Sequence, residues 1–260
     1  MIMENFKTYL SEDGTEICGE TKILFGQCGA DRCLHLTEIM EYCADYVIDL
    51  YARQGYDRQK MNDMGYVQMV SRTSIHIDRM PCENEFMTVK VREEKPEGFQ
   101  LMRHYEFVSE KGDRLIEGKS LWVIVEPETH SVVAPGKFQC LSKSEVQTEF
   151  EKKPGKIKVP ENLEFLGDQK ILLSHLDPNG HLTNAKYINF AIDFLPDEYQ
   201  HKEITDFRLN FCREIKKGEV MHVYGFFDDE NRKIVVAGKR DVPESGGKME
   251  SSFECELFYR

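Results

Sequence analysis

The chain has 260 residues, 40% of them hydrophobic, and its 34 basic against 46 acidic residues give a formal net charge of −12. This length allows one large domain or two of about 100–150 residues, with enough apolar content for a core. The acidic balance argues against general nucleic-acid binding, which usually needs a basic surface to neutralise phosphates. No stretch approaches the roughly 18 apolar residues of a membrane span, and the first residues lack the features of a secretory signal. We therefore expect a cytoplasmic protein that binds neither membrane nor nucleic acid.

The cysteines and histidines show no metal-binding pattern. The eight cysteines are scattered and form no Cys-x-x-Cys pair, so neither a zinc-ribbon spacing nor a redox motif is present. Reduced thiols are what a cytosolic protein usually contains. The histidines at 76, 104, 130, 175, 201 and 222 fall at no metal-ligand spacing. The sequence predicts no metal site, and we expect no cofactor.

The first predicted helix lies early in the chain. Apolar residues recur there at steps of three and four, which is typical of a helix with one buried face. They are Leu36, Ile39, Met40, Cys43, Val47 and Leu50. A connection over 51–72 follows, and residues 120–125 then have the alternating pattern of a strand.

A basic segment separates two halves of the chain. Residues 143–165 contain Pro154, Gly155 and Pro160 without a sustained apolar period, which favours a solvated linker. Its lysines are Lys143, Lys152, Lys153, Lys156 and Lys158. We therefore expect an N-terminal half at 1–142, a linker at 143–165 and a C-terminal half at 166–260.

The second half begins with a turn-forming run, Asp177-Pro-Asn179-Gly-His181. Thr183 or Asn184 is the expected N-cap of the helix that follows. This helix shows the same three- and four-residue steps before Pro196 ends it, at Tyr187, Phe190, Ala191 and Phe194. Residues 252–257 have the pattern of a late strand, as residues 120–125 do.

The two halves read as an internal repeat. Residues 31–37 align with 177–183 at an offset of 177 − 31 = 146, which pairs Asp with Asp and His with His. Residues 77–89 align with 211–223 at an offset of 213 − 79 = 134. The drop of 146 − 134 = 12 places a longer connection between helix and sheet in the first half.

Each half therefore reads as a lead-in strand, one long helix and several antiparallel strands. A helix wrapped by an antiparallel sheet is an α+β arrangement, and this order of elements is that of the hotdog fold. The sequence predicts a double hotdog made of two tandem halves.

The aligned copies differ where chemistry is concerned. The second half has Asn179 where the first has Cys33, and Glu214 where the first has Met80. Since a duplicated scaffold needs only one reaction centre, we expect the second half to be catalytic and the first to shape the pocket.

The second half also resembles a known family. Residues 176–188, which include Asp177, Asn179, His181, Asn184 and Tyr187, are similar to the Asp-x-Asn-x-His-x-Asn-Asn-x-x-Tyr signature of the acyl-acyl-carrier-protein thioesterases. These are the plant plastid FatA and FatB enzymes and their bacterial relatives. Arg213-Glu214 resembles the downstream Arg-Glu-Cys stretch of that family, and the resemblance covers nearly the whole chain.

The resemblance implies hydrolysis of acyl-carrier-protein thioesters, with release of free fatty acid in fatty acid biosynthesis. It implies a catalytic set of Asp177, Asn179, His181 and Glu214. Ile215 replaces the cysteine of the family's motif, so no covalent cysteine mechanism can use that position. Cys212, on the other side of Glu214, is expected to belong to the core.

These residue types also suit the reaction on chemical grounds. Thioester hydrolysis needs an activated water and a place for negative charge on the carbonyl oxygen, and a helix N-terminus favours such charge. In our hypothesis Glu214, assisted by His181, activates the water, Asn179 positions water or carbonyl, and Asp177 orients its neighbours. The sequence leaves open which of His181 and Glu214 takes the proton.

The expected partner is an acyl carrier protein. Such carriers are acidic, so a local basic patch must attract them to this acidic chain. The substrate-binding residues are expected to be Asn184, Tyr187, Arg213, Lys216 and Lys217. The family suggests a homodimer. The alternatives are an acyl-coenzyme A thioesterase, a dehydratase or hydratase on the same fold, and a non-catalytic acyl-binding protein.

Overall fold

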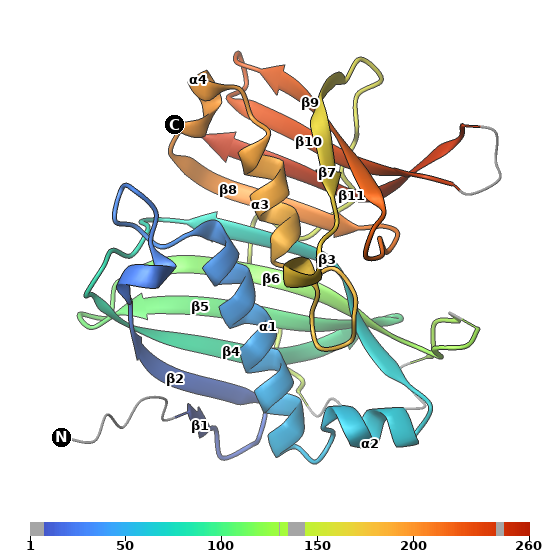
Figure 1. Cartoon of the computed structure of the whole chain (residues 1–260). Coiled ribbons are helices and arrows are strands. Elements are labelled where there is room, and N and C mark those ends of the chain that lie inside the picture. Colours follow the sequence, from blue (N-terminus) through green and yellow to red (C-terminus); the bar gives the residue numbers. More distant parts are fainter. Residues whose placement is uncertain (1–7, 130, 135–143, 243–246) are drawn as a thin grey trace. The chain divides into compact units, whose positions relative to one another are not determined.

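The computed structural model describes residues 8–129, 131–134, 144–242 and 247–260. The chain forms two compact units, one up to Lys153 and the other from Pro154 onward. Each unit has one antiparallel sheet and one main helix (Figure 1). None of the helices in the described residues is long and apolar enough to cross a membrane.

The first unit is built on a six-stranded antiparallel sheet. Its strands follow the order β1-β2-β4-β5-β6-β3. The elements in chain order are β1 (Thr8–Leu10), β2 (Glu16–Lys22), the 3-10 turn η1 (Phe25–Gln27), α1 (Leu36–Arg53), α2 (Arg58–Asp63), β3 (Val67–Ile77), β4 (Phe86–Glu97), β5 (Gln100–Ser109) and β6 (Arg114–Val125).

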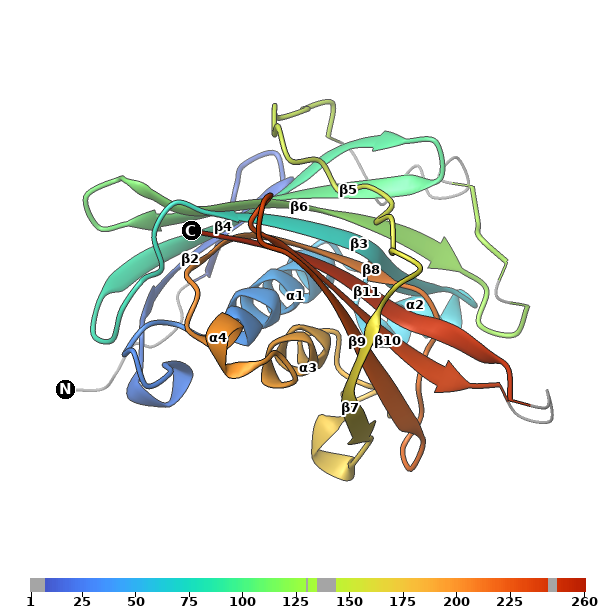
Figure 2. The same cartoon turned by 90° about the horizontal axis from the view of Figure 1, so that it is seen from above.

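The predicted apolar stripe of α1 faces this sheet. Ile39, Met40, Cys43, Val47 and Leu50 are all buried, and the helix packs against β2 and β4. Figure 2 shows α1 on one face of the sheet. The helix prediction is confirmed because its apolar residues recur with the helical period.

The second unit repeats the plan with five strands, in the order β8-β11-β10-β9-β7. The elements in chain order are β7 (Glu164–Lys170), the 3-10 turn η3 (Leu173–His175), α3 (Lys186–Asp193), α4 (Asp197–Gln200), β8 (Ile204–Phe211), β9 (Val220–Asp228), β10 (Lys233–Asp241) and β11 (Met249–Tyr259).

Helix α3 begins later than the sequence indicated. Its N-cap is Ala185, which makes no side-chain capping bond, so the expectation of Thr183 or Asn184 as the N-cap was wrong. The Lys186 N–H instead bonds the Thr183 carbonyl at 2.9 Å. The chain closes a turn there before the α-helix starts, and the backbone therefore replaces the side-chain cap.

The loop before each main helix repeats with a different offset from the one that residue identity indicated. In the first unit the Gly29 N–H bonds the Cys33 carbonyl at 2.9 Å, and in the second the Asp177 N–H bonds the His181 carbonyl at 2.8 Å. The offset is therefore 177 − 29 = 181 − 33 = 148, and the predicted value of 146 was wrong. Cys33, rather than His35, stands where the second unit has His181.

The reason for this shift is visible in the backbone. Arg32 has a φ of 63° and Gly180 a φ of 83°, and the two positions differ by 180 − 32 = 148. A sequence does not show that an arginine adopts the left-handed conformation, so Arg32 could not be matched to Gly180. The identical residues His35 and His181 were aligned instead, and this gave the wrong offset. His35 corresponds to Thr183 in the second unit.

The predicted offset of 134 farther along is confirmed. Asn84 before β4 has a φ of 70° and Gly218 before β9 a φ of 89°, at 218 − 84 = 134. Met80 therefore stands where the second unit has Glu214. The difference between offsets is 148 − 134 = 14, so the connection in the first unit is longer than predicted.

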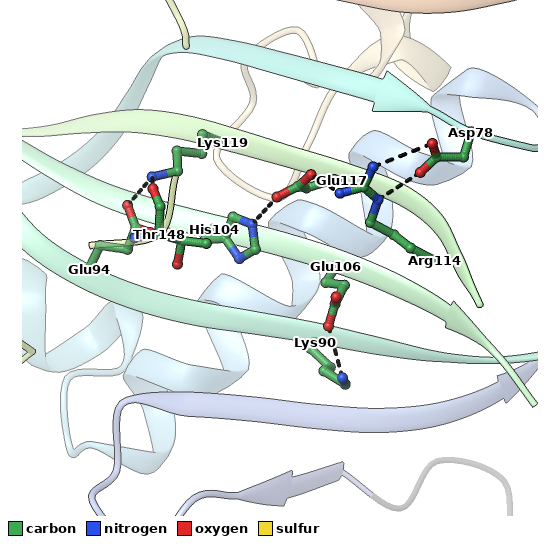
Figure 3. A network of polar contacts seen from close by, with 9 residues as sticks. All are labelled: Asp78, Lys90, Glu94, His104, Glu106, Arg114, Glu117, Lys119 and Thr148. Carbon is green, nitrogen blue, oxygen red and sulfur yellow. Dashed lines mark hydrogen bonds and ion pairs between the residues drawn. The ribbon is translucent and has the colours of Figure 1, made fainter. Parts of the chain in front are cut away.

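Part of the expected linker is fixed to the first unit. The Thr148 N–H donates to Glu94 Oε1 at 2.7 Å, and its carbonyl accepts from Lys119 Nζ at 2.6 Å (Figure 3). Lys119 and Glu94 also pair directly at 2.6 Å. The linker lysines 152, 153, 156 and 158 are exposed as expected, while Lys143 lies outside the described residues.

We predict that Glu94→Ala destabilises the first unit by about 3–5 kcal/mol. The substitution leaves the Lys119 ammonium, whose side chain is 3% exposed, without its carboxylate partner. Glu106→Ala is the matched control, because its pair with Lys90 is about one-third exposed (Figure 3) and contributes about 1 kcal/mol or less. Urea unfolding measures both variants, and equal losses would contradict the prediction.

Candidate active site

The loop of residues 177–181 is organised by one carboxylate. Asp177 Oδ1 accepts from the backbone N–H groups of Asn179, at 2.8 Å, and His181, at 3.1 Å. Asp177 Oδ2 accepts from the Asn179 side-chain amide at 3.2 Å. An Asp that bonds the backbone two residues ahead makes a tight turn, as the sequence predicted. Asp177 therefore fixes the backbone on which His181 is carried.

His181 lies at the end of this loop with its side chain 55% exposed. The next residue, Leu182, is 4% exposed and forms an isolated bridge with Leu176. Because successive side chains in extended backbone point to opposite sides, burial of Leu182 turns the imidazole outward. His181 is thus held by the backbone and remains open to solvent.

Glu214 approaches the imidazole from the connection between β8 and β9. Its Oε1 atom lies 2.8 Å from His181 Nδ1. The neighbouring residues fix it: Ile215 is fully buried, and the Arg213 carbonyl accepts from Ser252 Oγ at 2.7 Å. Glu214 Oε1 is shielded from water and receives no hydrogen bond of standard geometry among the described residues, so the imidazole is the polar group that faces it.

The two asparagines of the motif have different surroundings. Asn179 is exposed, and the contacts that the structure gives it are those with Asp177. Asn184 is exposed in the turn before α3, where its carbonyl accepts weakly from the Tyr187 N–H at 3.4 Å. The loop therefore brings Asn179 to Asp177, while Asn184 stands at the start of the helix.

Tyr187 lies in the core of the second unit. It is 4% exposed, and its ring packs on Phe211 and Phe253 with centroid distances of 5.6 and 5.2 Å. Burial raises the pKa of Tyr187 to about 12. The hydroxyl therefore stays protonated at neutral pH, 3.5 Å from Ser252 Oγ.

The three basic residues expected to bind substrate are exposed. Arg213 is 69% exposed and lies 3.7 Å from Glu250, a loose ion pair. Lys216 and Lys217 occupy the turn that leads to β9. The Lys216 backbone N–H is fixed by Glu219 Oε2 at 2.8 Å, which leaves its ammonium on the surface.

Cys212 is exposed, so the expectation that it belongs to the core was wrong. Strand β8 ends at Phe211, and the strict alternation of strand faces no longer applies one residue later.

Within the described residues, no three His, Cys, Asp or Glu side chains are grouped as a metal site would need.

His175, for which no role was predicted from the sequence, braces the loop. Its Nδ1 atom accepts from the Leu172 N–H at 3.2 Å, and its carbonyl accepts from the Thr183 N–H at 2.9 Å. Burial, and then the nearby Lys186 ammonium, lower the pKa of His175. The neutral imidazole that results is able to accept a hydrogen bond. Gln27, which stands 175 − 27 = 148 residues earlier, accepts from the Leu24 N–H in the same way through its Oε1 atom.

The first unit has no acid–base pair at the equivalent place among its described residues. Cys33 stands at the position of His181, and its sulfur lies 3.1 Å from that of Cys82. Burial, and then the hydrogen bond with Cys82, raise the pKa of Cys33 to about 12, so this thiol keeps its proton. Met80 replaces the carboxylate of Glu214.

Each unit, with one main helix on an antiparallel sheet, has the layout of the hotdog fold. Sequence models of protein families match residues 17–135 as the acyl-ACP thioesterase N-terminal domain and residues 165–253 as the acyl-ACP thioesterase C-terminal domain. The chain belongs to the acyl-ACP thioesterase family, and the predicted family and double hotdog fold are confirmed.

Solved structures agree on the fold. An acyl-ACP thioesterase from Bacteroides thetaiotaomicron matches with a TM-score of 0.83 at 20% identity, covering 96% of this chain and 100% of that one. The 12:0-ACP thioesterase from Umbellularia californica matches with a TM-score of 0.80 at 16% identity, covering 94% and 97%. Comparison with the curated proteins gives no match.

We predict that Asp177→Ala lowers kcat roughly tenfold or more and destabilises the second unit by about 1–2 kcal/mol. The backbone N–H groups of Asn179 and His181 lose their acceptor, and the imidazole is no longer held in place. Asp31→Ala is the control, since Asp31 makes a similar bond to the Cys33 N–H, at 2.9 Å, in the first unit. Steady-state kinetics and thermal unfolding measure both, and an equal fall in kcat would contradict the prediction.

Proposed function

We propose that the chain releases free fatty acid from acyl-acyl-carrier-protein by direct attack of a water molecule that His181 and Glu214 activate. Family membership supports the substrate and the hydrolytic reaction. The observation that carries the mechanism is the 2.8 Å separation of His181 Nδ1 and Glu214 Oε1. An imidazole oriented by a carboxylate is a common arrangement for general base catalysis.

The geometry favours His181 as the base. An ionised carboxylate only accepts hydrogen bonds, so the imidazole nitrogen facing Glu214 is the one that carries the proton. His181 Nε2 then keeps a free lone pair, and the 55% exposure of the side chain leaves room for water there. In this assignment Glu214 sets the tautomer and stabilises the imidazolium that forms when the water is deprotonated.

Asn179 is the proposed contact for the thioester carbonyl. A side-chain amide has two N–H donors, and one of them is directed to Asp177 Oδ2 at 3.2 Å. That bond fixes the side chain while the second N–H stays available to an oxyanion. Asn184, at the start of α3, would add a second amide near the positive end of the helix dipole.

No cysteine nucleophile is needed in this scheme. Ile215 is fully buried at the position where the family's motif has cysteine. In the proposed scheme water adds to the thioester carbon while His181 takes its proton, which gives a tetrahedral intermediate. The C–S bond then breaks, the carrier's prosthetic arm leaves as a thiol that takes the proton from the imidazolium, and the acid is released without an acyl-enzyme.

We predict that His181→Ala and Glu214→Gln each lower kcat by roughly 10²–10⁴-fold with little change in thermal stability. Both side chains are partly exposed, so their removal leaves no cavity in the core. His35→Ala is the control from the first unit, where residue 35 corresponds to Thr183. A comparable loss of activity in His35→Ala would contradict the assignment of catalysis to the second unit.

The main alternative substrate is acyl-coenzyme A, which carries the same thioester on a small nucleotide. Comparing kcat/KM for one acyl chain on carrier protein and on coenzyme A decides between them. The proposal expects carrier protein to be preferred and the difference to become smaller at high salt, because screening weakens electrostatic attraction between protein surfaces.

We predict that exchanging Lys216 and Lys217 together for Glu raises KM for the carrier-protein substrate by about tenfold or more. Two positive charges become negative on a surface that must attract an acidic carrier. Small acyl thioesters without the carrier should be hydrolysed at the wild-type rate. Unchanged carrier kinetics would show that these lysines are merely solvated and would favour coenzyme A.

The proposal extends to the setting in which the enzyme works. We propose a cytoplasmic homodimer, as the resemblance to the family suggests. Light scattering tests the assembly, with an expected mass of about twice the 30.3 kDa of one chain. A mass of one chain at micromolar concentration would contradict the dimer.

A further inference from the structure

Two leucines are exposed next to the active-site loop. Leu172 is 49% exposed and Leu173 is 70% exposed, in the 3-10 turn between β7 and the loop of Asp177. We call this pair the leucine turn. Single exposed apolar residues are common on protein surfaces, whereas here two adjacent ones are exposed in a fixed turn beside the reaction centre.

The leucine turn is held in one conformation. The Leu172 N–H is bonded to His175 Nδ1 at 3.2 Å, and the Leu176 N–H is bonded to the Leu173 carbonyl at 3.2 Å. A surface that is already ordered loses little conformational entropy when a partner binds. The hydrogen bonds of the turn therefore keep the two leucine side chains exposed.

Backbone hydrogen bonds place Lys216 and Lys217 beside this turn. The Gly218 N–H bonds the Ile171 carbonyl at 2.9 Å, and the Ile171 N–H bonds the Glu219 carbonyl at 2.9 Å. The chain that carries the two lysines thus runs alongside the residue that precedes Leu172. On its other side, the turn is joined to the His181 loop through the bond between the Thr183 N–H and the His175 carbonyl.

We propose that the leucine turn is the apolar anchor on which the acidic carrier protein docks, with Lys216 and Lys217 supplying the attraction beside it. This inference rests on the proposed function. Apolar side chains at the centre of an interface supply most of the binding energy, while flanking charges steer association. The anchor adjoins the His181 loop, so a carrier seated there presents its acyl arm to the reaction centre.

The first unit contains the same turn without the two lysines beside it. Leu24 is 53% exposed and Phe25 is 82% exposed, at 172 − 24 = 148 residues before the leucine turn. The position of Lys217, however, is taken by Glu83, which is paired with Arg32 at 2.7 Å. An acidic carrier finds no net positive charge there. The exposed pair Leu24 and Phe25 therefore serves as a control surface within the same chain, because it is apolar but lacks the two lysines.

The test compares Leu173→Ser with Phe25→Ser in the full chain. Binding of the carrier with its prosthetic arm but no acyl group is measured by calorimetry, and kcat/KM is measured with acyl-carrier and with a small acyl thioester. Both side chains are mostly exposed, so each variant should keep the wild-type thermal stability.

We expect Leu173→Ser to weaken carrier binding about tenfold and to lower kcat/KM for acyl-carrier to the same extent. The small thioester should be hydrolysed within about twofold of wild type, since a contact made only with the carrier leaves the chemistry untouched. Phe25→Ser should change none of these quantities. Equal carrier affinity in wild type and Leu173→Ser, or an equal loss in Phe25→Ser, would overturn the proposal.

The binding arm separates this inference from the proposed function. If the carrier binds through the leucine turn but its acyl group is not hydrolysed, the proposed function fails and the docking surface stands. If acyl-carrier is hydrolysed and Leu173→Ser is indistinguishable from wild type, the docking surface fails and the proposed function stands.

Discussion

The approach of His181 Nδ1 to Glu214 Oε1, at 2.8 Å, joins the loop of Asp177 to the connection between β8 and β9. One loop is set by the Asp177 carboxylate and braced by His175; the other is held by buried Ile215 and by Ser252. Neither side chain is itself packed tightly, so the geometry of the pair depends on the backbone beneath it. A reaction centre of this kind needs a rigid backbone beneath it, while its side chains can remain exposed to solvent.

Duplication explains how such a site can be asymmetric. Both units keep the 3-10 turn, the left-handed residue in the loop and the hydrogen bond that joins the turn to the start of the helix. The side chains at the meeting point differ, with Cys33 and Met80 in one unit and His181 and Glu214 in the other. The same backbone arrangement therefore carries an acid–base pair in one unit and other residues in the other.

The sequence predicted the elements better than their register. Helices α1 and α3 were found because apolar residues repeat with the helical period, and the meeting of His181 with Glu214 was expected from the motif. The equivalence of Cys33 and His181 was not, because Arg32 adopts a left-handed conformation that only glycine would have signalled. The bracing by His175 and the anchoring of Thr148 each pair a side chain with a backbone N–H, and a sequence does not show which backbone N–H a side chain will meet. The apolar period placed Tyr187 on the buried face of the helix, whereas the motif placed it among the substrate-binding residues. In the structure Tyr187 lies in the core.

The central claim is that water, activated by His181 and Glu214, attacks the thioester directly. A single turnover with enzyme in excess, run in heavy-oxygen water, tests it most directly, because the first acid released records where its new oxygen came from. Direct attack predicts acid that carries the heavy oxygen in the first turnover and a Glu214 peptide that carries none. Unlabelled acid together with heavy oxygen in the Glu214 carboxylate would mean that Glu214 forms an acyl anhydride, and would contradict the account.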